Sequence, residues 1–163
     1  MAQAFRSDQT FDDCGRPMNA YEVSTDRQRL DVAAIHAFLT QSYWSPNVPR
    51  ETVETAIRNS IVVGAYSGAL QVGFARAITD CATFAYFADV YVLEAHRGHG
   101  IALRMMTALR ALPELQGLRR MLLATRDAHE LYTKIGFRPL AAPHSFMERH
   151  NPNAYAPIHA VEG

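Results

Sequence analysis

Residues 89–102 read DVYVLEAHRGHGIA, and the organisation of the chain is best understood from this stretch. An apolar strand leads into a short basic turn with two glycines, and a helix follows. Gly98 and Gly100 allow the main chain to turn sharply and to approach a ligand closely. The free N–H groups of the first helical turn, together with the helix dipole, favour an anion. The stretch therefore predicts a cradle for a phosphorylated ligand.

Two motifs in this chain resemble those of one enzyme family. Residues 97–102, RGHGIA, fit the R/Q-x-x-G-x-G/A signature of the GCN5-related N-acetyltransferases (GNAT). Residues 128–137, AHELYTKIGF, are similar to the A-x-x-L-Y-x-K-x-G-F segment that follows it in that family. Either motif alone is a weak signal, but the two in order are specific. The resemblance covers residues 21–146 of the chain.

The resemblance implies an α/β fold. It has a mixed, mostly antiparallel central sheet, splayed at the fourth strand, with helices on both faces. Hydrophobic patterning predicts a first helix ending near residues 43–44, a hairpin over 61–66 and 70–78, and a strand over 83–93. It also predicts a helix that Asp127 caps and two last strands at 137–140 and 146–149. We expect residues 1–17 to be a flexible extension, 18–150 a single domain and 151–163 an irregular tail.

The bulk composition excludes several classes of protein. The 163 residues are 48% hydrophobic, enough for one globular core, and the 16 basic residues balance the 16 acidic ones. Such a balance attracts neither nucleic acid nor an anionic membrane, and the apolar run at 84–93 is too short to span a bilayer. Two cysteines and a polar start without a signal-peptide core predict a cytoplasmic protein. Whether the chain forms a homodimer is left open.

The family resemblance implies acetyl-coenzyme A (acetyl-CoA) as cosubstrate. In the relatives the loop holds the pyrophosphate, and the pantetheine arm adds to the edge of the splayed strand. On that basis the backbone N–H of Val92 is the candidate donor to the oxyanion. The cofactor-binding residues implied are Val90, Val92, Arg97, Gly98, His99, Gly100, Ile101 and Ala102.

The catalytic candidate that the resemblance implies most directly is Tyr132, which matches a family tyrosine placed near the thioester sulfur. A phenol with an ordinary pKa near 10 can donate a hydrogen bond to a thiolate as it leaves. The alternative is a half-buried tyrosine whose hydroxyl binds the backbone and whose role is structural.

Asp89 is the second catalytic candidate, since an ionised carboxylate on a buried strand needs a partner. The segment at 87–92 resembles a strand of the diamine acetyltransferases, in which a Glu-Asp pair faces the substrate amine, but Ala88 stands at the Glu position. Asp89 is therefore an amine anchor, a base acting through water, or the partner of Arg76 on the neighbouring strand.

Four aromatic residues are candidate walls of a pocket for the amine: Tyr43, Trp44, Tyr86 and Phe87. Trp44 could face a cationic amine, although core packing is the commoner role of such side chains. The resemblance implies transfer to a primary amine, expected to be on a small molecule, by direct attack without a covalent enzyme intermediate. Whether the acceptor is a small amine, an amino acid, an antibiotic or a protein amino group is left open.

Other readings fit the sequence less well. The glycine loop begins like a dinucleotide-binding G-x-G-x-x-G but has Leu103 at the third position, and no Gly-Lys-Ser/Thr follows for a P-loop. Cys81 lies in an expected turn with nothing to activate it, and the spacing of His96, His99 and His129 does not favour a metal. A coenzyme A binding sensor without transferase activity is the alternative that remains.

Overall fold

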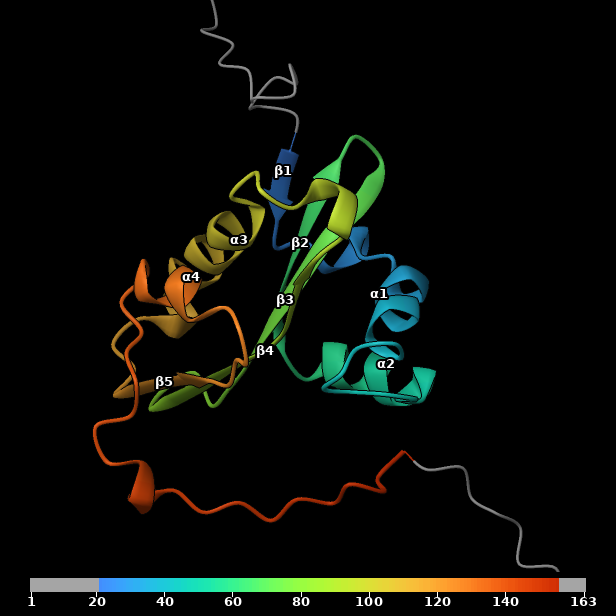
Figure 1. Cartoon of the computed structure of the whole chain (residues 1–163). Coiled ribbons are helices and arrows are strands. Elements are labelled where there is room, and N and C mark those ends of the chain that lie inside the picture. The colour runs from blue at the N-terminus through green and yellow to red at the C-terminus, as the bar shows by residue number, and fades with distance from the viewer. Residues whose placement is uncertain (1–20, 156–163) are drawn as a thin grey trace, which may run out of the picture.

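The computed structural model describes residues 21–155, so the expected extension at 1–17 and the last residues of the tail lie outside the described part. Its centre is a five-stranded sheet in the order β1-β2-β3-β4-β5 (Figure 1). The first four strands pair antiparallel, and β4 pairs parallel with β5. The strands are β1 (Tyr21–Ser24), β2 (Ile61–Ser67), β3 (Leu70–Thr79), β4 (Phe84–Val92) and β5 (Arg120–Leu123). This mixed sheet with helices confirms the expected fold class.

Helices cover both faces of the sheet. In Figure 1, α1 (Val32–Leu39) and α2 (Arg50–Arg58) lie on one face, while α3 (Ile101–Arg110) and α4 (His129–Thr133) lie on the other. Each face encloses a hydrophobic cluster. Met105, Met106 and Leu109 of α3 are fully buried in one cluster, and Ile35 of α1 packs with Phe74 of β3 in the other. No helix within residues 21–155 is long and apolar enough to cross a bilayer.

The strand β4 separates from β5 halfway along its length. The two strands are paired from Phe84 to Phe87 of β4, and β5 ends opposite Phe87. Just beyond, Asp89 has a φ of 55°, and the register between β3 and β4 shifts there. A bulge of this kind bends the strand and increases its twist. The second half of β4 therefore has a free edge on the side where β5 would continue.

Three sequence expectations about local structure are wrong. The first helix ends at Leu39 rather than near 43–44, because the Ser42 hydroxyl binds the Leu39 carbonyl and a turn follows. Residues 137–140 and 146–149 form no strand, consistent with the missing N–H of Pro139. Asp127 does not cap α4, which has no side-chain cap.

Candidate active site

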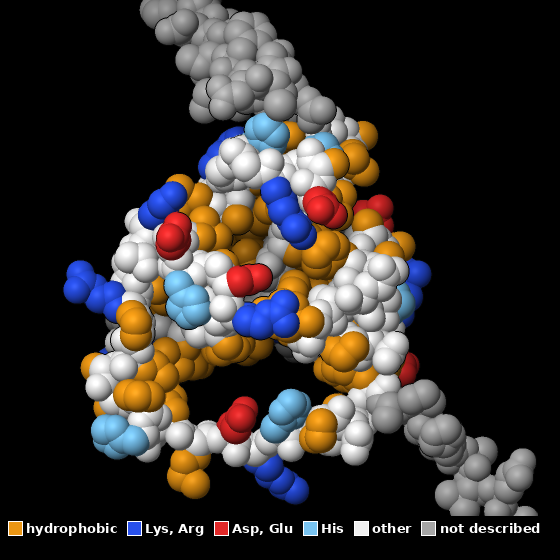
Figure 2. Space-filling model, viewed as in Figure 1, with side chains coloured by type: hydrophobic (Ala, Val, Ile, Leu, Met, Phe, Trp, Pro, Cys, Tyr) orange, Lys and Arg blue, Asp and Glu red, His pale blue; other side chains and the backbone are white. Residues whose placement is uncertain are grey.

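A cavity of about 1010 Å³ opens where β4 and β5 separate. Figure 2 shows a hollow on this face with apolar walls and charged side chains at its rim. Its wall comes from the glycine loop, both sides of β4, the loop after α1, the loop after β5, and α4. Twelve of the residues singled out from the sequence line it: Tyr43, Trp44, Tyr86, Phe87, Asp89, Val90, Val92, Arg97, Gly98, Gly100, Ala102 and Tyr132.

The glycine loop at one end of the cavity has the features of an anion cradle. Gly98 and Gly100 have φ values of 82° and 69°, a region in which side chains other than glycine are strained. An added Cβ at either glycine would meet no atom within 4 Å, so the space above the loop is open. The N–H groups of residues 101–103, in the first turn of α3, have no acceptor among the described residues. This geometry fits the pyrophosphate of a coenzyme.

The side chains of two residues of the loop motif do not line the cavity. The side chain of Ile101 is buried in the core, so its possible contact with a ligand is through the backbone N–H. The ring of His99 lies against Tyr21, with 5.4 Å between ring centroids. Both residues help to fix the start of α3 against the sheet.

The free edge of β4 presents backbone groups to the cavity. The N–H of Leu93 donates to the carbonyl of Val72 on β3 at 2.8 Å. Because successive residues of a strand alternate the side to which their N–H and C=O groups point, those of Val92 face the free edge. The Nε of Arg97 donates to this carbonyl of Val92 at 3.1 Å. The strand edge and the glycine loop are thereby connected by a side chain of the motif.

Tyr132 projects from α4 into the same cavity. Its side chain is buried, and the ring of Phe137 contacts it edge-on at 6.1 Å between centroids. Burial, with smaller effects from Tyr43 and Asp127, raises the pKa of Tyr132 to about 12. Within the described residues no group hydrogen-bonds its hydroxyl. At neutral pH the phenol is therefore protonated and able to donate a hydrogen bond.

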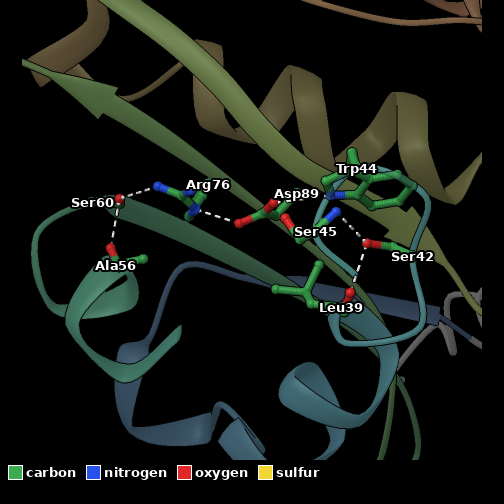
Figure 3. A network of polar contacts seen from close by, with 8 residues as sticks. All are labelled: Leu39, Ser42, Trp44, Ser45, Ala56, Ser60, Arg76 and Asp89. Atoms are coloured by element: carbon green, nitrogen blue, oxygen red, sulfur yellow. Dashed lines mark hydrogen bonds and ion pairs between the residues drawn. The ribbon is translucent and has the colours of Figure 1, made fainter. Parts of the chain in front are cut away.

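Asp89 is held by two side chains at the bulge (Figure 3). Arg76 donates from Nε to Oδ2 at 2.5 Å, and Trp44 donates from the indole N–H to Oδ1 at 3.1 Å. Arg76 also donates to the hydroxyl of Ser60, which donates to the carbonyl of Ala56 on α2. Of the readings left open by the sequence, the structure has the ion pair with Arg76. The carboxylate is thus neutralised by Arg76, and the hydrogen bonds through Ser60 connect the bulge to α2.

Aromatic side chains form a further part of the cavity wall. Tyr43 and Trp44 are 52% and 39% exposed and contact each other edge-on, so they belong to the cavity surface and not to the core. Phe38 stacks on Tyr91 at 3.7 Å between centroids. Phe87, by contrast, is 2% exposed, and most of its surface is in the core.

Sequence reasoning missed the other ten residues that line the cavity, among them Phe38, Thr125, Arg126 and Asp127. The last three lie in the loop after β5, and its position beside Tyr43 depends on a contact between segments far apart in sequence. Phe38 lies on α1, where nothing in the sequence distinguishes a side chain that lines a cavity from one in the core. Among residues 21–155 no group of His, Cys, Asp and Glu is arranged to hold a metal ion.

Comparisons with known proteins agree with the geometry. The model of the "Acetyltransferase (GNAT) domain" family matches residues 58–139. A Gibberella zeae protein described as a "putative acetyltransferase" is 36% identical over 135 residues, which are 70% of this chain and 76% of that protein.

Solved structures give the same fold. A Xanthomonas campestris protein described as a "putative acetyltransferase belonging to the GNAT family" superposes with a TM-score of 0.80 at 47% identity. The match covers 83% of this chain and 96% of that one. A Clostridium acetobutylicum protein, described as a predicted acetyltransferase and solved with acetyl-CoA, superposes with a TM-score of 0.60 at 16% identity, covering 80% and 94% of the two chains.

Proposed function

We propose that the protein, which belongs to the GNAT family of acetyltransferases and uses acetyl-CoA, transfers the acetyl group to a primary amine of a small molecule by direct attack. One observation carries this proposal: a single cavity connects the glycine loop, the free edge of β4 and the hydroxyl-bearing end of α4. A thioester and an amine held together there would react as if intramolecular, which can supply roughly 7–11 kcal/mol of the barrier.

The glycine loop is the proposed binding site for the pyrophosphate. Its backbone donors and the N-terminus of α3 complement two adjacent negative charges. Arg97 would add a cation beside the loop, and its hydrogen bond to the carbonyl of Val92, the last residue of β4, supports this role. The free edge of β4 is then available to the amide groups of the pantetheine arm, as an added strand would use it.

The N–H of Val92 is the proposed donor to the thioester oxygen. As the amine attacks, negative charge develops on that oxygen, and a fixed backbone donor stabilises it more than the ground-state carbonyl. The neutral amine forms the new N–C bond while the C–S bond breaks. One amine proton leaves to water, and the thiolate finally takes a proton, so that free coenzyme A and an amide are the products.

Tyr132 is the proposed group that assists the departing sulfur. With a pKa of about 12 its phenol keeps its proton against a thiolate whose conjugate acid has an ordinary pKa of about 8.5. Tyr132 therefore acts as a hydrogen-bond donor to the sulfur rather than as a source of the proton. Burial and the contact with Phe137 hold the ring in place for this role.

The proposal is tested by incubating the full chain with acetyl-CoA and a panel of small primary amines. Release of free thiol, with the amide product identified by mass spectrometry, is the expected result. Intact mass of the protein after acetyl-CoA alone should be unchanged, because no enzyme-bound acetyl group is required. Binding of coenzyme A without thiol release from any amine would contradict the proposal.

A further inference from the structure

The loop between β5 and α4 brings two opposite charges to the cavity that the steps above do not use. Arg126 and Asp127 both line the cavity and are exposed at its rim. The side-chain hydrogen bond within this loop is made by a different residue: the hydroxyl of Thr125 accepts from the N–H of Ala128 at 3.0 Å. The two charged side chains are therefore available to a ligand.

Arg126 lies over an aromatic ring. Its guanidinium carbon lies 4.0 Å from the centre of the Tyr43 ring, and no carboxylate of the described residues forms an ion pair with it. A cation over a ring face is attracted by it, and no hydrogen bond within residues 21–155 uses the N–H donors of this guanidinium. A planar fork of donors beside an aromatic wall matches the two oxygens of a carboxylate.

Asp127 lines the same cavity as Tyr132, the residue proposed to assist the departing sulfur. Its charge also contributes, less than burial does, to the raised pKa of Tyr132. No hydrogen bond or ion pair joins it to another side chain within residues 21–155. Asp89, in contrast, is already bound by Arg76 and Trp44. Asp127 is thus the better placed of the two carboxylates to receive the ammonium form of an acceptor.

We propose, resting on the transferase function above, that the acceptor is an amine that also carries a carboxylate, such as an α-amino acid. Arg126 binds the acceptor carboxylate, and Asp127 holds the ammonium group beside Tyr132 until it loses a proton to water. The neutral nitrogen then bonds to the acetyl carbon as the C–S bond breaks. The aromatic surface of Phe38 and Trp44 accommodates an apolar side chain.

Matched pairs of substrates test this inference: each α-amino acid is compared with its own carboxamide, which lacks the negative charge. With acetyl-CoA saturating, kcat/KM for the acid should exceed that for the amide by about tenfold, which is about 1.4 kcal/mol. Arg126→Gln should lower the value for the acid and bring the ratio close to one. Asp127→Asn should raise KM for both substrates and leave the ratio unchanged.

Arg119→Gln is the matched control, since Arg119 is exposed and lies outside the cavity. It removes the same charge and should leave the ratio as in the unchanged protein. Equal use of acids and amides, or a ratio insensitive to Arg126→Gln, would overturn the inference while leaving the transferase function intact. Weaker coenzyme A binding in Arg126→Gln would also overturn it, by assigning Arg126 to the cosubstrate. Thiol release from no amine would overturn both proposals.

Discussion

Arg76 and Asp89 form an ion pair across two neighbouring strands at the bulge that bends β4, with 2.5 Å between Nε and Oδ2. Their side chains are 15% and 9% exposed. The pair is thus largely removed from water, and the geometry of the cavity wall depends on it. A mutation that removes one partner leaves an uncompensated charge in a place that solvent reaches poorly.

We therefore expect Asp89→Asn to destabilise the fold by about 3 kcal/mol, because Arg76 loses its counter-charge. Urea unfolding followed by circular dichroism measures the change. Glu54→Gln is the control: it removes the exposed pair with Arg50 on α2 and should cost well under about 1 kcal/mol. Similar losses in the two variants would show that the pair at the bulge is not effectively buried.

Gly100→Ala should weaken coenzyme A binding. The positive φ at Gly100 makes the substitution cost about 1 kcal/mol of stability, and the new methyl group projects into the open space of the cradle. Gly68→Ala carries a comparable φ of 60° in the β2–β3 turn with open space around it, so it controls for strain alone. Titration calorimetry of both variants should show a loss of affinity in Gly100→Ala and none in Gly68→Ala.

Tyr132→Phe should lower kcat about tenfold, the usual effect of losing one hydrogen bond to a charged group, with KM for acetyl-CoA nearly unchanged. The ring and its contact with Phe137 are retained, so the fold should tolerate the change. Steady-state kinetics with a saturating amine is the measurement. An unchanged kcat would remove the hydroxyl from the reaction, and a large fall in stability would assign it a structural role.

Stability should fall as the pH rises from 10 towards 12, partly because of Tyr132. Its pKa is raised to about 12 in the folded chain, chiefly by burial, whereas an unfolded tyrosine ionises near 10. Over this window the unfolded state loses protons that the folded state keeps, and the equilibrium shifts towards unfolding. Between pH 9 and pH 11 the free energy of unfolding should therefore fall less in Tyr132→Phe than in the unchanged protein. An equal fall would contradict the raised pKa.

The sequence predicted the parts of this structure that depend on local chemistry. The glycines at 98 and 100 indicated a sharp turn before a helix, and both have positive φ just before α3. The hairpin of β2 and β3 followed from two apolar runs separated by a polar turn. The family motifs also gave the divergence of β4 from β5, a feature that no local pattern indicates. The ion pair with Arg76 was one of the readings that burial of Asp89 allowed.

Features that depend on contacts between distant segments escaped the sequence. The loop after α1 takes its course because Ser42 closes the helix early, and this course brings Tyr43 beneath Arg126. No periodicity marks such a meeting of two loops. The last two strands were predicted at 137–140 and 146–149, but no described strand pairs with either segment, and four residues without a paired neighbour do not form a strand.

One part of the cavity is formed by backbone groups and another part by exposed side chains, and this difference has an evolutionary consequence. Backbone amides of the glycine loop and of Val92 keep their positions under most substitutions of side chains. The part of the cavity proposed to hold the coenzyme should therefore tolerate changes of sequence. The rim around Tyr43 and Arg126 consists of exposed side chains that the core does not require. A few exchanges there could redirect the enzyme to a new acceptor while the scaffold and its donor chemistry stay the same.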